Sequence, residues 1–349
     1  MDVILEITDV GFGGKAVARL EDGRVCFVRD ALPGERVKAR VHRQTTRFVE
    51  AELVEILETS PRRVVPPCPY YGTCGGCSYQ HTAYDYQLEL KTKQVRDTLR
   101  RLGGIENPNV TEGMPSPLAY GYRNRITVHR RDGRIGFHRR DGRGLVDIEA
   151  CLLASDAVNK LLTQLRHEPV REGARTLREH NDRFGFHQTN DVVAGLLLDA
   201  VAAACGEGGE LLVDAYCGDG FFARKLAPKF RRAIGIEWNE RSIAQAREIA
   251  APNESYLEGD VSALLDEALV GGPATVILDP PAQGVEPRVI DSLSGAAVEK
   301  LIYVSCDPST LARDLKMLAG SYVLESATPF DMFPQTAEIE VLAILRPRA

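Results

Sequence analysis

Residues 211–223 read LLVDAYCGDGFFA, an apolar run followed by a glycine-rich turn and the start of a helical pattern. The apolar run is typical of a buried strand, and glycines at such a turn let a ligand approach the backbone at the N-terminus of the next helix. Four more strand-like segments follow, separated by helical patterns: RAIGIEW (232–238), SYLEGDV (255–261), TVILDPP (275–281) and KLIYVSC (300–306). This alternation predicts a parallel, Rossmann-like α/β sheet from about residue 176 onward.

Acidic residues end four successive strands of this predicted sheet: Asp214, Glu237, Asp260 and Asp279. So many carboxylates at one edge would repel a pyrophosphate. The turn at Gly218, with Glu237 nineteen residues later, also fits a degenerate dinucleotide fingerprint, so the turn alone leaves an NAD site open. The Asp279-Pro280-Pro281 motif is more typical of S-adenosylmethionine methyltransferases than of dehydrogenases. We therefore expect an adenosyl ligand at this edge.

Cys306 ends the fifth predicted strand and precedes the helical pattern TLARDLKML. C5 of a pyrimidine is a poor nucleophile until a group adds to C6, and a cysteine thiolate can make that addition and leave again. A helix N-terminus stabilises a thiolate, so we expect this position to lower the pKa of Cys306. Cys306 could otherwise be a small buried residue at a strand end.

A methyl transfer to C5 also requires a base that removes the C5 proton. Glu340 lies in the otherwise apolar stretch IEVLAIL, where a dry setting would raise the pKa of a carboxyl group into a useful range. Glu338 is two residues away and would share its strand face, so spacing alone does not choose between the two.

Eight cysteines occur in a chain that shows neither a signal peptide nor a membrane-length apolar run, so we expect a cytoplasmic protein with reduced thiols. Cys68, Cys74 and Cys77 have the spacing C-x5-C-x2-C, and Cys151 is the natural fourth partner. Zinc sites more often use two separate C-x2-C pairs. The spacing therefore favours a [4Fe–4S] cluster, with zinc as the alternative.

The N-terminal third of the chain has a different texture from the C-terminal half. Residues 1–58 alternate apolar and polar positions in short runs separated by turn signals, which predicts a small OB-like β-barrel. Residues 59–175 contain the cysteines, a helical pattern at about 82–102 and an arginine-rich hairpin with Asp132-Gly133 as its turn, and predict a mixed α+β domain.

The net charge of −6 conceals an asymmetry along the chain. Residues 1–150 carry 24 basic and 20 acidic side chains, whereas residues 151–349 carry 19 basic and 29 acidic ones. Eight arginines lie between Tyr120 and Arg143. Guanidinium groups suit phosphate contacts, although charge alone equally allows a solvated hairpin face.

Together these motifs resemble one family, the bacterial RNA uracil-5-methyltransferases that carry an N-terminal TRAM domain and a [4Fe–4S] cluster. The resemblance spans essentially the whole chain. It rests on GFGGKAVARLEDGRVCFVRDALPGE, CPYYGTCGGC, YRNR, FGFHQTN, DAYCGDG, GIE, LDPP, VSCDPSTLARD and DMFPQTAEIE.

The resemblance implies a TRAM barrel (1–58) that binds RNA, a central iron–sulfur domain (59–175) and a class I S-adenosylmethionine-dependent methyltransferase domain (176–349). It implies C5-methylation of a uridine in structured RNA, 23S ribosomal RNA rather than transfer RNA, with Cys306 as nucleophile and Glu340 as base. The residues implied to bind S-adenosylmethionine are Gln188, Tyr216, Gly218, Glu237, Asp260 and Asp279. The implied cluster ligands are Cys68, Cys74, Cys77 and Cys151, and the RNA contacts we expect are Arg123, Arg125, Arg130 and Arg131.

Two positions depart from the family pattern. Ala282 follows Asp-Pro-Pro where members commonly have arginine, and Phe221 stands where some relatives have asparagine. Transfer RNA methylation and a catalytically degenerate RNA-binding protein of the same fold therefore stay open as alternatives. We expect no membrane association and no obligate protein partner.

Overall fold

The computed structural model describes residues 1–168, 171–179 and 188–348. The chain divides into two compact units. The first comprises Met1–Gln94, Ser116–His180 and Phe333–Glu338, and the second comprises Val95–Pro115, Asn181–Met332 and Ile339–Ala349.

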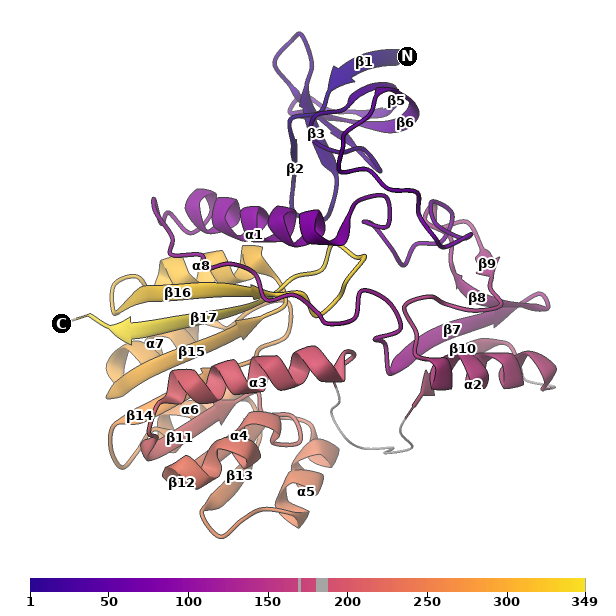
Figure 1. The fold of residues 1–349 in the computed structure, drawn as a ribbon. Coiled ribbons are helices and arrows are strands. Elements are labelled where there is room, and N and C mark those ends of the chain that lie inside the picture. The colour runs from indigo at the N-terminus through magenta and orange to yellow at the C-terminus, as the bar shows by residue number, and fades with distance from the viewer. Residues whose placement is uncertain (169–170, 180–187, 349) are drawn as a thin grey trace. The chain divides into compact units, whose positions relative to one another are not determined.

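The first unit begins with a six-stranded sheet in the order β1-β5-β6-β4-β3-β2 (Figure 1). Its strands are β1 (Asp2–Glu6), β2 (Asp9–Val10), β3 (Ala16–Arg19), β4 (Val25–Val28), β5 (Arg36–Gln44) and β6 (Phe48–Glu58). Buried and less buried positions alternate along these strands, and Cys26, Val28 and Val37 are fully buried. The short strands that the turn spacing predicts are present, and they pair as one six-stranded sheet.

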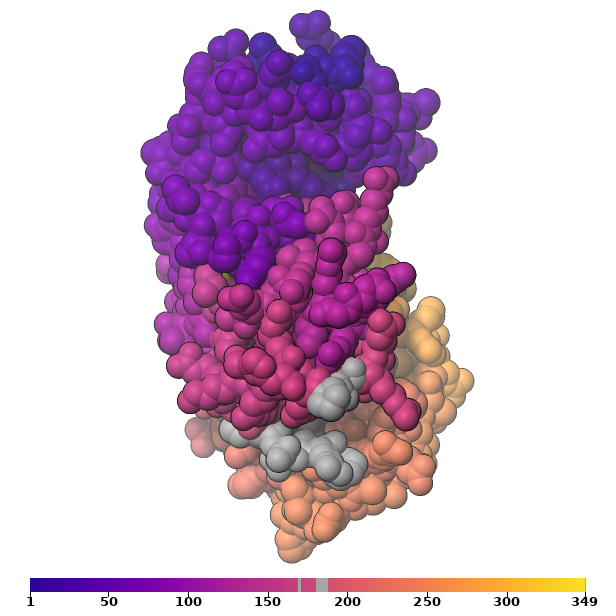
Figure 2. Space-filling model, turned by 90° about the vertical axis from the view of Figure 1, so that its right-hand side faces the viewer, coloured from indigo at the N-terminus to yellow at the C-terminus, as the bar shows by residue number. Residues whose placement is uncertain are grey.

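A four-stranded sheet in the order β10-β7-β8-β9 follows in the same unit. Its strands are β7 (Arg125–Arg131), β8 (Arg134–His138), β9 (Leu145–Asp147) and β10 (Gly173–Arg178), and α2 (Asp156–His167) belongs to the same unit. Helix α1 (Tyr84–Arg101) begins in the first unit, and its residues from Val95 onward belong to the second. Asp132 and Gly133 both have positive φ, as a two-residue hairpin turn requires. The boundary expected at 175/176 falls within β10, which pairs with β7. The barrel and this region form one continuous surface, indigo to magenta in Figure 2.

The second unit is built on a seven-stranded sheet in the order β13-β12-β11-β14-β15-β17-β16. Its strands are β11 (Gly209–Ala215), β12 (Phe230–Glu237), β13 (Glu254–Glu258), β14 (Ala274–Leu278), β15 (Val298–Ser305), β16 (Tyr322–Phe330) and β17 (Glu340–Pro347). The connecting helices are α3 (Asp191–Cys205), α4 (Phe221–Leu226), η1 (Ala227–Lys229), α5 (Glu240–Glu248), α6 (Val261–Ala268), α7 (Pro287–Gly295) and α8 (Pro308–Leu318).

Strands β11 to β15 run parallel, which confirms the predicted α/β sheet. All five residues of β14 are buried, and so are the last five of β15, because helices lie over both faces of a parallel sheet. The strand order reverses between β11 and β14, and ligands of such sheets bind outside the carboxyl ends of the strands at this point. β17 lies between β15 and the edge strand β16 and pairs antiparallel with both.

Among the described residues, no helix combines the length and apolar character needed to cross a membrane.

Gly220 offers a test of how the glycine turn is built. Its φ is +86°, and a Cβ on this residue would lie 2.6 Å from the Tyr256 hydroxyl and 3.0 Å from ring carbons of Tyr256. We expect Gly220→Ala to lower the free energy of unfolding by about 1–3 kcal/mol, measured by urea denaturation. Gly195→Ala in α3 is the control, because a Cβ there meets no atom within 4 Å, and this variant should be neutral or slightly more stable.

Candidate active site

The turn after β11 is made of residues with left-handed backbone conformations. Gly218 and Gly220 have φ values of 56° and 86°, which glycine adopts without cost, but Tyr216 has φ 66°. A non-glycine residue in this region is strained, and such strain concentrates at functional sites. The turn leads directly into α4, at the place where the sequence predicts a ligand.

Glu237 and Asp260 lie at the ends of the next two strands. The carboxylate of Glu237 accepts hydrogen bonds from the amides of Gly218 (3.2 Å) and Asn239 (2.8 Å), so it is held against the glycine turn. Asp260 is exposed and caps α6 by accepting from the Ser262 amide at 2.7 Å. Glu237, at the end of β12, therefore contacts the turn that the sequence assigns to the cofactor. Asp260 instead caps a helix.

Asp214 and Asp279 sit deeper at the same edge. Burial raises the pKa of Asp279 to about 7. Asp214 is fully buried, and burial together with the charges of Asp279, Asp219 and Glu237 raises its pKa to about 8. One oxygen of Asp214 accepts from the Ala223 amide at 2.7 Å, and the other has no hydrogen-bond partner among the described residues. The sequence places Asp214 among the acids at this edge, and the structure adds that it is the most deeply buried of them.

Cys306 and Glu340 are brought together by strand pairing. In the antiparallel pair β15–β17, Ser305 lies opposite Val341, so the next position along the ladder sets Cys306 opposite Glu340. Cys306 is the one exposed cysteine of the eight, all of which the structure describes, and Glu340 is 5 % exposed. A thiol and a dry carboxylate thus face the same end of the sheet.

The thiol of Cys306 is not activated in the way that the sequence suggests. We expected the N-terminus of the following helix to lower its pKa. Instead, partial burial, followed by the negative charges of Glu340 and Asp279, raises the pKa of Cys306 to about 11. The helix N-terminus is already occupied, because the Asp307 side chain accepts from the amides of Ser309 and Thr310. That prediction was wrong.

The motif FGFHQTN is only partly described, because residues 184–187 lie outside the described ranges. Gln188 is described and half-buried, two residues before the N-cap of α3. Asn190, which we had not singled out, is that N-cap. It is fully buried, accepts from the Val193 amide and donates to the Met332 carbonyl at 3.4 Å. The motif therefore connects α3 to the segment that leads into Glu340.

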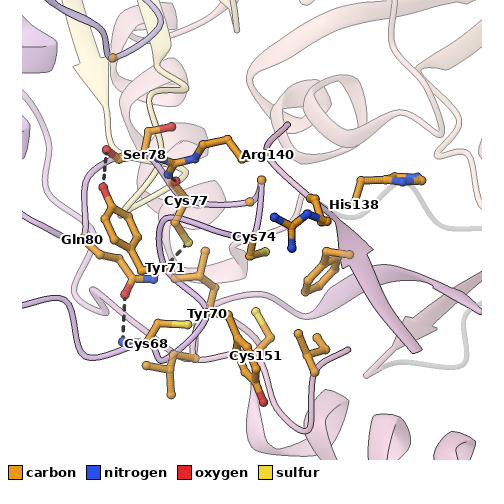
Figure 3. A pocket seen from close by; sticks show the side chains of 18 of the residues that line it. Cys68, Tyr70, Tyr71, Cys74, Cys77, Ser78, Gln80, His138, Arg140 and Cys151 are labelled. Carbon is orange, nitrogen blue, oxygen red and sulfur yellow. Dashed lines mark hydrogen bonds between the residues drawn. The ribbon is translucent and has the colours of Figure 1, made fainter. Parts of the chain in front are cut away.

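Four cysteines of the first unit line one cavity of about 620 Å³. Figure 3 shows the side chains of Cys68, Cys74, Cys77 and Cys151 converging on it. Burial raises the pKa of Cys77 to about 12 and also raises those of Cys74 and Cys151. Gln80 donates to the Cys77 sulfur at 3.1 Å. Buried thiols are hard to ionise, and a metal that accepts soft sulfur ligands would favour their thiolate form.

The spread of these thiols bears on what they can bind. Within the described residues, no group of three or more His, Cys, Asp or Glu side chains is arranged to hold a metal ion. Thiolates are soft donors that suit both zinc and an iron–sulfur cluster. The structure itself shows neither.

The four arginines expected to contact RNA are in different environments. Arg123 lines the cysteine cavity and donates to the Tyr122 hydroxyl, and Arg130 donates to the Glu168 carbonyl at 2.9 Å. Arg125 is half-buried, whereas Arg131 is exposed at the tip of the hairpin. Arg140, which we did not single out for binding, pairs with Asp30 of the barrel and donates to the Cys77 carbonyl at 2.6 Å.

Comparisons with known proteins agree with this geometry. Residues 3–54 match the TRAM domain, and residues 272–348 match the family described as tRNA (uracil-5-)-methyltransferase. An uncharacterized RNA methyltransferase of Gloeobacter violaceus is 32% identical over 98% of this chain and 96% of its own length, and one of Bdellovibrio bacteriovorus is 33% identical over 98% and 94%. The structure of Pyrococcus abyssi tRNA (uracil-54, C5)-methyltransferase with S-adenosyl-L-homocysteine is similar with a TM-score of 0.75 and 26% identity, covering 99% of this chain and 100% of that one.

The raised pKa of Cys306 predicts how its reactivity depends on charge. With a pKa of about 11, Cys306 is mostly protonated at pH 8. At that pH, each unit by which the pKa falls increases the thiolate fraction about tenfold. Glu340→Gln removes a negative charge, so we expect alkylation of Cys306 by iodoacetamide at about pH 8 to become about two- to tenfold faster. Mass spectrometry of the Cys306 peptide measures the rate. Glu338→Gln is the control: Glu338 is exposed and is not among the charges that raise this pKa, so an equal acceleration in that variant would contradict the assignment.

Proposed function

Because this chain belongs to the RNA methyltransferase family and its C-terminal part matches the uracil-5 branch, we propose that it methylates C5 of a uridine in structured RNA. Its fold is a class I methyltransferase domain with an N-terminal TRAM domain. The observation that carries the proposal is the placement of Cys306 opposite Glu340, next to Asp279, at the carboxyl edge of the sheet.

The two side chains supply the two operations that C5 chemistry needs. The Cys306 thiol gives up its proton to solvent, and the resulting thiolate adds to C6 of the uracil ring, which turns the ring into an enolate with a nucleophilic C5. S-adenosylmethionine, when bound, supplies the methyl group that C5 takes up. Glu340 then accepts the C5 proton, the C5–C6 double bond re-forms, and the thiolate leaves. A carboxylate that is 5 % exposed suits the role of base, because a dry setting favours proton uptake.

We propose that the edge around the glycine turn binds S-adenosylmethionine. The residues assigned to it are Gln188, Tyr216, Gly218, Glu237, Asp260 and Asp279. Support comes from the carboxylates gathered there, which attract a cationic ligand and hydroxyl groups and repel phosphates, and from the S-adenosyl-L-homocysteine bound to the Pyrococcus abyssi enzyme. Asp260 has the weakest support, since it is exposed and caps α6.

We further propose that Cys68, Cys74, Cys77 and Cys151 hold a [4Fe–4S] cluster. Support comes from their convergence on one cavity and from the soft donor set. Zinc is the alternative. Four thiolate ligands would leave no iron open for substrate, so a structural rather than a chemical role for the cluster follows.

The RNA partner is assigned by charge and by the TRAM domain. The barrel and the arginine-rich hairpin with Arg123, Arg125, Arg130 and Arg131 are proposed to contact the phosphate backbone. The family resemblance favours ribosomal RNA, whereas the Pyrococcus abyssi neighbour acts on transfer RNA. Mapping 5-methyluridine in both RNAs from a deletion strain separates the two targets.

Substitution of the nucleophile tests the proposed reaction. We expect Cys306→Ala to abolish methylation of the target RNA, measured by transfer of a labelled methyl group, while RNA binding stays within about twofold. With 5-fluorouridine in the RNA, the wild-type protein should form a covalent adduct, since fluorine cannot leave C5 as a proton does. Absence of this adduct, with binding intact, would support the degenerate RNA-binding protein instead.

The cysteine cavity yields a separate prediction about composition. Protein purified without oxygen should contain about four irons and four sulfides per chain and absorb visible light, and Cys77→Ala should lose both. Equimolar zinc without sulfide would overturn the cluster assignment in favour of the alternative. Metal analysis and sulfide determination on the same sample decide between them.

A further inference from the structure

The segment Phe333–Glu338 is not an ordinary loop between two strands. It follows β16, which belongs to the second unit, and leads into β17 at Glu340, which also belongs to the second unit, yet the segment itself belongs to the first unit. The residue proposed as the base is therefore attached, two residues along the chain, to a segment whose partners lie in the unit that contains the cysteines.

Buried side chains of the first unit hold the backbone of this segment. Lys91 donates to the Phe333 carbonyl at 3.1 Å, and the Tyr122 hydroxyl donates to the Pro334 carbonyl at 3.0 Å. These two donors are 1 % and 5 % exposed. Burying a lysine and a tyrosine hydroxyl has a large desolvation cost, so a connection that only spans two strands would not require them.

Gln335 is the centre of the contacts. Its amide donates to the Gln87 side chain at 3.0 Å, and the Gln87 amide group donates to the Gln335 side chain at 2.9 Å. Both glutamines are almost fully buried, at 0 % and 2 % exposed. Gln335 has φ 69°, a strained conformation for a residue other than glycine, which persists only where surrounding contacts impose it.

The cysteine loop completes the arrangement. The amides of Ser78 and Tyr79, which directly follow Cys77, both donate to the Gln335 carbonyl, at 2.9 and 3.0 Å. The barrel also reaches the segment, because a Cβ on Gly14 would lie 3.0 Å from the Ala337 Cβ. Helix α1, the cysteine loop and a barrel turn thus all contact the same six residues.

We propose that Gln87 and the backbone of the cysteine loop position Glu340 by fixing the segment 333–338, so that the integrity of the cysteine site controls proton abstraction rather than nucleophilic addition. This inference rests on the proposed function of Glu340. Gln87 touches no reacting atom in this proposal and acts as a positioning residue. Cys306 is carried by β15 and needs none of these contacts.

Two measurements on the full-length protein test the proposal in the variant Gln87→Met. This variant keeps the side-chain volume and removes both hydrogen bonds with Gln335, together with those that Gln87 donates to the Tyr79 and Thr82 carbonyls. The first is hydrogen exchange of the Gln335 amide, which we expect to become about tenfold faster or more. The second is the fate of the covalent RNA adduct with ordinary uridine. Addition should proceed within about twofold of wild type, whereas release should slow about 10- to 100-fold, because a displaced base removes the C5 proton slowly.

Gln94→Met is the matched control. Gln94 is another buried glutamine of α1, but its side chain donates to the Tyr79 hydroxyl rather than to residues 333–338. It should leave both measurements near wild type. A further variant, Cys77→Ala, tests the contribution of the cysteine loop. We expect the Gln335 amide to exchange as fast in this variant as in Gln87→Met. If this variant does not fold, Gln87→Met still decides the question.

The outcomes separate this inference from the proposed function. Equal effects of Gln87→Met and Gln94→Met on amide exchange and adduct release would overturn the positioning role. Fast exchange of Gln335 with normal adduct release would overturn it as well, because the segment would then move without affecting the base. If wild-type protein forms no adduct with 5-fluorouridine RNA, the proposed function itself fails, and this result is seen before any variant is made.

Discussion

The antiparallel pairing of β17 with β15 is the constraint on which the candidate site depends. Glu340 is the first residue of β17, and Cys306 follows the last residue of β15. Only because the two strands run in opposite directions do the start of one and the end of the other meet at the same edge. A parallel β17 would begin at the opposite edge of the sheet, and the thiol and the carboxylate would be separated by the length of a strand.

The ends of the parallel strands concentrate negative charge around this pair. Burial, together with the charges of Asp279 and Glu237, raises the pKa of Asp214, and burial together with the charges of Glu340 and Asp279 raises that of Cys306. The first unit has the reverse character, with arginines beside four thiols. Such a division suits a protein whose N-terminal part would hold an RNA backbone while its C-terminal part excludes phosphates and admits a single base.

Much of the fold could be predicted from the sequence because its signals are local. The strand and helix periods, the turn at Asp132-Gly133 and the glycines near Gly218 each depend on a few neighbouring residues. The spacing of Glu338 and Glu340 could not separate the two, because only the start of β17 at Glu340 and the exposure of Glu338 distinguish them. The partners of Gln335 were equally out of reach, since its contact with Gln87 joins residues 248 positions apart.

The environment of Cys306 has a consequence for the survival of the protein in an oxidising cell. Peroxide attacks thiolates rather than thiols, and sulfinic acid, once formed, is not returned to cysteine by ordinary reductants. With its pKa held at about 11, this exposed sulfur is almost entirely protonated near neutrality. Partial burial and the neighbouring carboxylates therefore keep this side chain unreactive toward peroxide between encounters with RNA.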